Sequence, residues 1–375
     1  MSFFCQSRMA GRPIWPTVWV IAIGGLAALT PSAAQAAGEV PVGGLSPLVP
    51  ALVSAGPGTA RVVVSPDGKS AYATNRFSTT VSQYARNTQT GALTALSPAT
   101  VQAGSSPEGI VISPDGKHAY VANRYSNTVS EYSRNTETGI LKPLTPAAVT
   151  AGEGPIGLTI STDGKNVYAA NSTSQTVSEY SRSSTTGQLS PLNPATVPAG
   201  ANAHGIVLSP TGTNAYVANY GSNTVSQYSR NTTTGKLTAL TPATVPAGNN
   251  PHDLAISPDG KNVYVADNTS PGVLTQFARN TTTGTLTTLT PATVPAGEDS
   301  ECVVVSPDGE NAYATNEVTN NLSQYSRNTN TGALTPLTPP AIATGNEPSG
   351  IAISPDGKNI YTANTAESIS QYKRG

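Results

Sequence analysis

The sequence predicts an all-β fold, a seven-bladed β-propeller with four antiparallel strands in each blade. A unit built on the turn Ser-Pro-Asp-Gly recurs with small changes, and its first Ser stands at 65, 113, 161, 209, 257, 306 and 354, so successive units are 48 or 49 residues apart. Each unit holds four short segments rich in β-branched and aromatic residues, and none shows the 3.6-residue apolar period of a helix. One four-stranded sheet cannot bury both of its faces until neighbours stack on it, so seven such units are expected to form a closed ring.

The second unit shows the strands in order. We expect strands over residues 109–113, 118–123, 128–134 and 140–145. The first two are joined by Ser113-Pro114-Asp115-Gly116, in which Gly116 takes the position that tolerates positive φ. The link between the third and fourth strands ends in a glycine for the same reason.

The two ends of the chain predict how the ring closes. The last unit stops after its third strand and lacks the fourth. Residues 43–56 resemble residues 91–104, which lie 48 positions further on and include a fourth strand. We therefore expect the N-terminal strand to complete blade seven, which would remove an open sheet edge that invites aggregation.

Residues 1–36 are typical of a secretory signal peptide. Arg8 and Arg12 precede an apolar run over about residues 18–29, and the segment ends in small residues at Ala36. A membrane anchor is the alternative, but the run is short for a span of roughly 20 residues. We expect cleavage after Ala36, a propeller domain over residues 37–375, no stable membrane insertion after cleavage, and a periplasmic or secreted location.

Charge and cysteine content narrow the classes of partner. Without Arg8 and Arg12 the chain has 18 basic and 21 acidic residues, a difference of three negative charges. Such a balance gives no general attraction to nucleic acid or to an acidic membrane, and we expect a monomer without a nucleic-acid partner. Cys302 is then the one cysteine left, so no internal disulfide is expected.

Residues that differ between the seven units point to one rim of the ring. We call the rim formed by the loops before the first strand and after the second strand of each blade the top rim, and the opposite one the bottom rim. Three arginines, Arg61, Arg76 and Arg124, belong to the top rim. Most acids outside the repeated turn also belong there: Glu108, Glu153, Asp253, Asp267, Glu298, Asp299, Glu301, Glu317, Glu347 and Glu367.

The start of the first strand should point at the central channel. This position holds Ala60, Glu108, Ile156, His204, His252, Glu301 and Ser349 in successive blades. Two imidazoles and a carboxylate would then meet at the mouth of the channel. They could form a general-base site or bind a metal ion, while a solvated rim whose loops simply vary is the third reading. His118 belongs to the bottom rim, where we expect an ordinary surface residue.

The segments Ser113 to Asn123 and Thr234 to Leu240 resemble the YVTN-type repeats of the seven-bladed β-propeller superfamily that includes the lactonase family. The resemblance covers about residues 43–375 and implies a propeller fold and lactone hydrolysis. The pairs Pro251-His252 and Asn316-Glu317 are similar to short patterns of that family, whereas Ser300-Glu301 replaces a Pro-His pair. A phosphorylated sugar lactone fits poorly, because its phosphate would require clustered cations and this rim is mostly acidic.

Two functional hypotheses follow. The first is a hydrolase of small lactones, in which His204 or His252 acts as base and Glu301 and Glu317 assist. Its substrate contacts would come from five further side chains of the top rim: Arg76, Arg124, Tyr125, Tyr220 and Glu108. The arginines would stabilise the developing oxyanion. No cofactor is required, although a divalent cation in the channel mouth stays open. The second hypothesis is a non-catalytic scaffold whose top rim binds a protein, a glycan or a cation.

Overall fold

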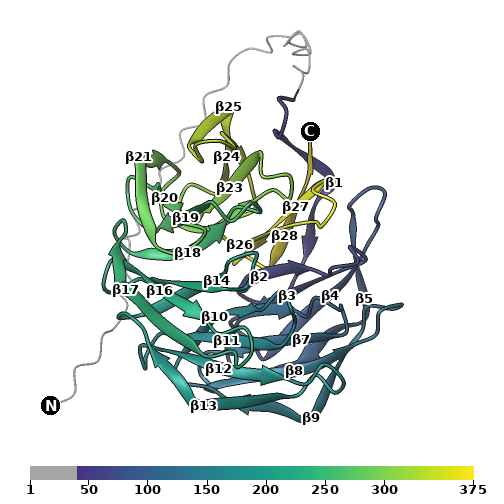
Figure 1. The fold of residues 1–375 in the computed structure, drawn as a ribbon. Helices are drawn as coiled ribbons and strands as arrows, with labels where there is room; N and C mark the ends of the chain where they lie inside the picture. The colour runs from purple at the N-terminus through teal and green to yellow at the C-terminus, as the bar shows by residue number, and fades with distance from the viewer. Residues whose placement is uncertain (1–39) are drawn as a thin grey trace, which may run out of the picture. The chain divides into compact units, whose positions relative to one another are not determined.

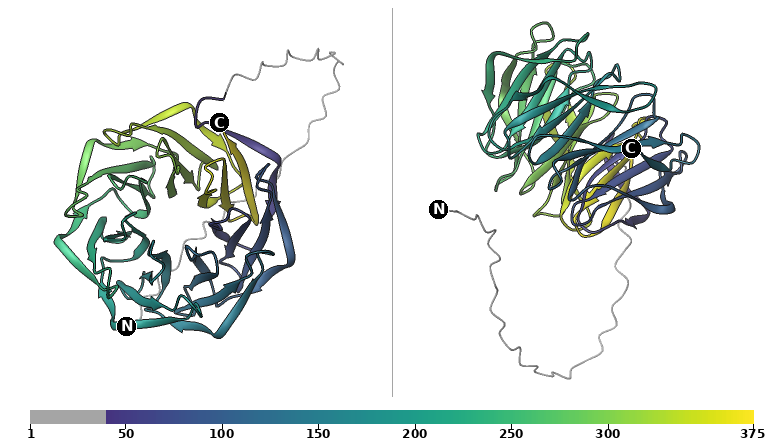
Figure 2. Two further views of the ribbon diagram at one scale, coloured as in Figure 1. Left: turned by 45° about the vertical axis from the view of Figure 1, so that its right-hand side comes forward. Right: turned by 90° about the horizontal axis from the view of Figure 1, so that it is seen from below.

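The computed structural model describes residues 40–375, which form a ring of seven four-stranded antiparallel sheets around a central channel (Figures 1 and 2). This confirms the predicted all-β propeller. No part of residues 40–375 is helical, so none of it is a helix that could cross a membrane. The predicted signal peptide lies outside the described residues.

Every blade repeats the same four strand positions from the channel outwards. The innermost strands are β2 (Thr59–Val64), β6 (Pro107–Ile112), β10 (Pro155–Ile160), β14 (Ala203–Leu208), β18 (Pro251–Ile256), β22 (Ser300–Val305) and β26 (Pro348–Ile353). The second strands are β3 (Ser70–Asn75), β7 (His118–Asn123), β11 (Asn166–Asn171), β15 (Asn214–Asn219), β19 (Asn262–Asp267), β23 (Asn311–Asn316) and β27 (Asn359–Asn364). The third strands are β4 (Thr80–Arg86), β8 (Thr128–Arg134), β12 (Thr176–Arg182), β16 (Thr224–Arg230), β20 (Val273–Arg279), β24 (Asn321–Arg327) and β28 (Ser368–Arg374). The outer strands are β5 (Leu93–Gln102), β9 (Leu141–Thr150), β13 (Leu189–Pro198), β17 (Leu237–Pro246), β21 (Leu286–Pro295), β25 (Leu334–Ala343) and β1 (Leu45–Ser54).

The outer strands are longer than the sequence predicts. In blade two the strand runs to Thr150, whereas the expected strand ends at residue 145. The pairing of β8 with β9 shifts register between Ser130 and Tyr132, so the strand continues past Pro146. Proline is tolerated there because β9 is the edge strand of its sheet, and at the register shift no hydrogen bond to β8 requires an N–H from Pro146.

The first and last strands close the ring. β1 pairs antiparallel with β28, from Leu45 opposite Arg374 to Ser54 opposite Ser368. Figure 2 shows the purple N-terminal strand beside the yellow C-terminal blade. The predicted closure by the N-terminal strand is therefore confirmed, and blade seven gains the outer strand that its own repeat lacks.

Tyrosines of the second and third strands fill the space between blades. Tyr120 is fully buried and packs with Val167 and Tyr180 of the next blade. Its hydroxyl donates a hydrogen bond to the carbonyl of Gly187, 2.5 Å away. Aromatic side chains supply much of the buried area in such interfaces, and here the hydroxyl also finds a partner.

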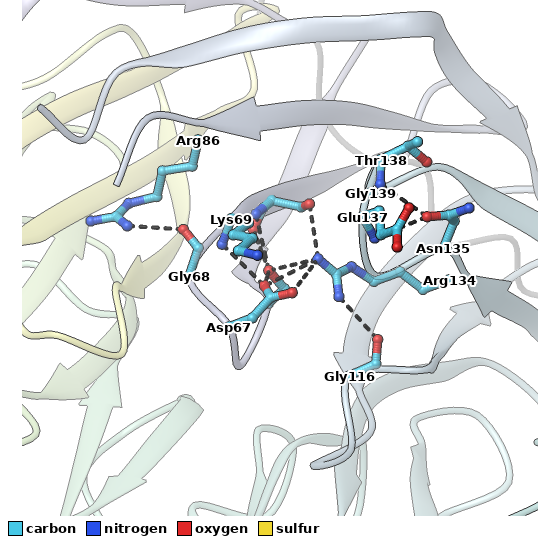
Figure 3. Close-up of polar contacts among 12 residues, drawn as sticks. Asp67, Gly68, Lys69, Arg86, Gly116, Arg134, Asn135, Glu137, Thr138 and Gly139 are labelled. Carbon is cyan, nitrogen blue, oxygen red and sulfur yellow. Dashed lines mark hydrogen bonds and ion pairs between the residues drawn. The ribbon is translucent and has the colours of Figure 1, made fainter. Parts of the chain in front are cut away.

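An arginine at the end of the third strand fastens each blade to the one before it. Figure 3 shows Arg134 reaching the carboxylate of Asp67 in blade one, with an NH2–Oδ2 distance of 3.0 Å. The same guanidinium donates to the hydroxyl of Tyr72 at 2.8 Å and to the carbonyl of Gly116 at 3.0 Å. The aspartate of the repeated turn therefore also holds an interblade ion pair, which we call the latch.

The latch recurs at six of the seven interfaces in the described ring. The other five pairs are Arg86–Asp356, Arg182–Asp115, Arg230–Asp163, Arg327–Asp259 and Arg374–Asp308. Between blades four and five Thr211 replaces the aspartate, and Arg279 has no carboxylate partner there.

His118 is part of this framework, and the expectation of an ordinary surface residue was wrong. The side chain is buried, and its Nδ1 lies 2.8 Å from the guanidinium of Arg182. The latch arginine needs an acceptor at this position, which Ser or Asn provides in the other blades. Burial and the neighbouring Arg182 lower the pKa of His118, consistent with a neutral ring that accepts the hydrogen bond.

Candidate functional site

The second residues of the innermost strands form a ring at the top of the channel. In it the structure brings together His204 of β14, His252 of β18 and Glu301 of β22, from three neighbouring blades. The two imidazole rings meet edge to face with centroids 4.6 Å apart. His252 Nε2 lies 3.5 Å from Glu301 Oε2. The three side chains thus form one contiguous cluster.

A second ring lies just above, formed by the residue that follows each second strand. It holds Arg76, Arg124, Ser172, Tyr220, Asn268, Glu317 and Thr365. Tyr220 stacks on His204 with centroids 5.1 Å apart, and it lies 6.2 Å from the ring of His252. The predicted residues Tyr220, Arg76 and Glu317 therefore lie above the histidine and glutamate cluster.

Glu301 is the most tightly held carboxylate of the cluster. Its Oε1 accepts a hydrogen bond from Asn268 Nδ2 at 3.1 Å, and its Oε2 accepts one from Ser349 Oγ at 3.1 Å. Burial opposes ionisation, but His252 and nearby arginines outweigh it and lower the pKa of Glu301. Glu301 is therefore a buried carboxylate that stays ionised.

Glu317 has the opposite character. Burial raises its pKa, and the charge of the neighbouring Glu301 raises it further, to about 7. Two carboxyl groups this close do not both ionise easily, so Glu317 keeps the proton. Environments that separate two neighbouring pKa values in this way are typical of acid and base pairs in enzymes.

The two histidines also differ. His252 Nδ1 lies 2.9 Å from the carbonyl oxygen of Glu301. A carbonyl only accepts, so this hydrogen bond assigns the hydrogen to Nδ1 and leaves Nε2 facing the carboxylate. Burial lowers the pKa of His204 well below its usual value, and the charges of His252 and Arg124 act in the same direction. The Nδ1 atom of His204 is buried without a hydrogen-bond partner.

Two arginines reach the cluster through Ser349. Arg76 NH2 donates to Ser349 Oγ at 2.7 Å, and Arg61 NH1 donates to the same atom at 3.3 Å. Ser349 in turn donates to Glu301. The positive charge of blade one is thereby connected to the carboxylate of blade six across the closure of the ring.

A third ring below the cluster narrows the channel, and sequence reasoning missed it. Its positions hold Arg61, Gly109, Gly157, Gly205, Asp253, Cys302 and Gly350. A Cβ atom on Gly157 would lie 2.2 Å from the carbonyl oxygen of His204, so the inner strands approach too closely for a side chain there. Because the inner strands that carry glycine at this position approach one another closely, the ring is narrow and its polar residues come together.

The three polar residues of the third ring contact one another. The thiol of Cys302 donates to Asp253 Oδ2 at 2.6 Å, and Arg61 NH2 lies 3.9 Å from the same oxygen. Burial raises the pKa of Cys302 well above its usual value, so the thiol stays protonated. Beneath this ring the channel continues as a cavity of about 350 Å³ lined largely by apolar side chains of the inner strands. The signal for this ring was present in the sequence, as three departures at a position that is glycine in the other four blades.

Three predicted residues lie apart from the cluster. Arg124 lies over the ring of Tyr125, 5.8 Å from its centroid, and Tyr125 is 71% exposed. Glu108 is buried, and its backbone carbonyl accepts a hydrogen bond from Thr74. Within residues 40–375 none of the three makes a direct polar contact with the histidines or Glu301. No group of three or more His, Cys, Asp and Glu side chains in that part of the chain is arranged to hold a metal ion.

Solved structures with the same fold have diverse functions. A putative 6-phosphogluconolactonase from Bacteroides fragilis is 22% identical, with 78% of this chain and 86% of that chain covered and a TM-score of 0.69. The periplasmic gluconolactonase of Pseudomonas aeruginosa is 21% identical, covers 84% and 92%, and has a TM-score of 0.67. The hydrazine synthase of Kuenenia stuttgartiensis is 18% identical, covers 84% and 96%, and has a TM-score of 0.66. At these identities the likeness shows the fold alone.

The curated proteins compared with this chain include no match. A family model does match, and its description is "Lactonase, 7-bladed beta-propeller". The matched segments, residues 41–203, 190–305 and 296–374, together span the whole ring. The chain therefore belongs to the lactonase family of seven-bladed β-propellers.

Proposed function

We propose that this protein hydrolyses a small lactone at the top mouth of the channel. The observation that supports this best is the pair of neighbouring carboxyl groups, a buried Glu301 that is ionised beside His252 and a half-buried Glu317 whose pKa is raised to about 7. Ester hydrolysis requires a base for the attacking water and an acid for the leaving alkoxide. Glu317 can supply the acid, and the ionised Glu301 supports His252 as the base.

The residues take distinct roles in this reaction. Nε2 of His252 accepts a proton as water attacks the lactone carbonyl carbon, and the carboxylate of Glu301, 3.5 Å away, stabilises the positive ring that results. Glu317 gives its proton to the ring oxygen when the carbon–oxygen bond breaks, which releases a hydroxy acid. Arg76, already held by Ser349, faces the developing oxyanion.

The side chains around the mouth favour a polar substrate. His204, Tyr220 and Asn268 add hydrogen-bonding groups, and the apolar residues of the same ring positions are confined to Ala60 and Ile156. A hydroxylated lactone would satisfy these groups, whereas an alkyl lactone would leave them unpaired on binding. Tyr125 and Arg124 would contact the substrate from the rim, and Glu108 from blade two.

A lactone panel tests this function. Wild type, His252→Ala and Glu317→Gln are assayed by acid release against hydroxylated and alkyl lactones, with Glu153→Gln as control because Glu153 is exposed on the rim of blade three. We expect turnover of a hydroxylated lactone, a loss of about 100-fold or more in each site variant, and no change in the control. Absence of turnover above buffer on every lactone would refute the proposal.

A binding scaffold is the second candidate function. Phe77, Tyr125 and Val318 are 70%, 71% and 53% exposed on the top rim, and exposed aromatic side chains are common where a partner binds. A protein or glycan bound there without lactone turnover would favour this function.

Secretion remains part of the proposal. It rests on the sequence of residues 1–36, and the terminus of the exported protein tests it. Sequencing of the mature protein should begin at Ala37, and a chain that retains Met1 would contradict export by cleavage.

A further inference from the structure

The bottom rim collects every lysine of the chain. Five follow the repeated turn, one ends the third strand of blade seven, and two begin outer strands: Lys69, Lys117, Lys165, Lys261, Lys358, Lys373, Lys142 and Lys236. Antiparallel strands place these turns and strand ends on one side of the ring, and all eight side chains are exposed. We call this set the lysine face.

The lysine face has a large net positive charge although the chain as a whole is nearly neutral. Eight lysines, six latch arginines and Arg279 stand against six latch aspartates and four glutamates, Glu131, Glu137, Glu179 and Glu310, a difference of five positive charges. The latch arginines are largely buried and bonded to backbone and side-chain oxygens, so the lysines form the accessible part. The full chain has a formal net charge of -1.

We propose that the lysine face adsorbs the propeller onto a lipid bilayer that contains anionic phospholipids, with the channel mouth turned away from the membrane. The lysines come from blades one, two, three, four, five and seven, so their charge spreads around the rim. A partner with charge spread over a plane matches this distribution. Each lysine near an anionic membrane surface strengthens adsorption about fivefold.

Other anionic partners fit this face less well. Single-stranded nucleic acid is usually held by stacking on aromatic side chains, and the exposed aromatic residues of the described chain, Phe77 and Tyr125, lie on the top rim. Duplex DNA is bound by cationic side chains that follow its phosphates along the duplex, whereas these lysines are distributed around a ring. A second copy of this chain could offer its acidic top rim. Most acids of that rim belong to blades five to seven, so they do not match lysines that are distributed around the whole ring.

The test measures binding of the mature protein to lipid vesicles. Neutral phosphatidylcholine vesicles are compared with vesicles in which about a third of the lipid is phosphatidylglycerol. We expect binding to the anionic vesicles alone at about 0.1 M salt, and its loss at about 1 M salt, where the screening length falls from about 10 Å to about 3 Å. Absence of binding to anionic vesicles at the lower salt would overturn the proposal.

Two matched variants distinguish the effect of the lysine face on vesicle binding from the effect of the overall net charge. Replacing Lys69, Lys117 and Lys165 by Gln should weaken vesicle binding about 100-fold, and their side chains make no hydrogen bonds in the described ring that the change would break. Replacing Glu153, Glu298 and Glu367 by Gln on the top rim makes the chain more positive by the same three charges, and should leave binding within about twofold. The proposal is wrong if vesicle binding depends only on net charge, so that the first variant binds more weakly and the second more tightly. It is also wrong if duplex DNA displaces the wild-type protein from the vesicles.

Discussion

Replacing Glu317 by Gln should make the protein more stable, and mainly at neutral to alkaline pH. The folded protein raises the pKa of this carboxyl from its usual 4.5 to about 7. Between these values the unfolded chain releases the proton and the folded chain keeps it, so stability falls as pH rises, and the full cost is present above about pH 7. Gln is neutral at every pH, so the variant has no such cost.

The magnitude follows from the two pKa values. A difference of about 2.5 is worth about 3.4 kcal/mol at 1.36 kcal/mol for each pH unit. The side chain is only partly buried and water screens its charge, so we expect about 2 kcal/mol at pH 8. At pH 5 the unfolded carboxyl is about three-quarters ionised but still close to its pKa, and the same relation with the same screening leaves about 0.5 kcal/mol.

Guanidinium denaturation at pH 5 and pH 8, followed by circular dichroism, measures the difference in unfolding free energy between Glu317→Gln and wild type at each pH. Glu153→Gln removes an exposed carboxyl from the same rim and should change stability by less than about 0.5 kcal/mol at either pH. If Glu317→Gln is no more stable than wild type at pH 8, or if its advantage is the same at both pH values, then Glu317 is not the protonated member of the pair. The assignment of acid and base in the proposed reaction would fall with it.

Two further predictions concern the framework of blades four and five. Thr211→Asp should supply the missing latch to Arg279 and stabilise the protein by about 1 kcal/mol, because the equivalent Arg182 and Ser113 outweigh partial burial and lower the pKa of Asp115 to about 2. That gain should be present in denaturation curves above about pH 4 and lost between about pH 4 and pH 2, and a gain that persists in acid would contradict an ion pair. Asp267→Asn restores the residue found in the other six blades. Burial raises the pKa of Asp267 to about 7 against the opposing hydrogen bonds of Thr275, so the variant should be more stable by at least about 1 kcal/mol at pH 8 and no more stable below about pH 4. Equal stability at pH 8 would contradict this account.

The fold could be predicted from sequence because seven copies repeat one local pattern. The turn at Ser113 to Gly116, the tyrosines of the second and third strands and the truncated last unit each follow from local rules, and they agree with one another. The outer strands were predicted too short because a proline normally ends a strand, and the register shift that admits Pro146 depends on the partner strand β8. Such a shift has no local signature.

The candidate site was predictable in its positions but not in its contacts. The sequence indicates that His204, His252 and Glu301 hold equivalent positions in neighbouring blades, and the structure brings them into contact. Whether a catalytic role follows stays a prediction. The roles of Ser349 and Asn268 as partners of Glu301 were missed, because Ser and Asn are common in loops and their importance depends on a carboxylate about 50 or 30 residues away.

The interface between blades four and five links framework and site. Its upper end is the contact of His204 with His252, and its lower end is the interface of the described ring that lacks a latch, where Thr211 faces Arg279. Blade five also holds Asp267, whose buried Oδ1 has no hydrogen-bond partner. Each of these departures from the repeat lowers the stability of the fold. Random sequence drift would distribute such departures around the whole ring. Their concentration at one blade interface, whose upper end forms part of the channel mouth, is what selection for a reaction at that mouth would produce.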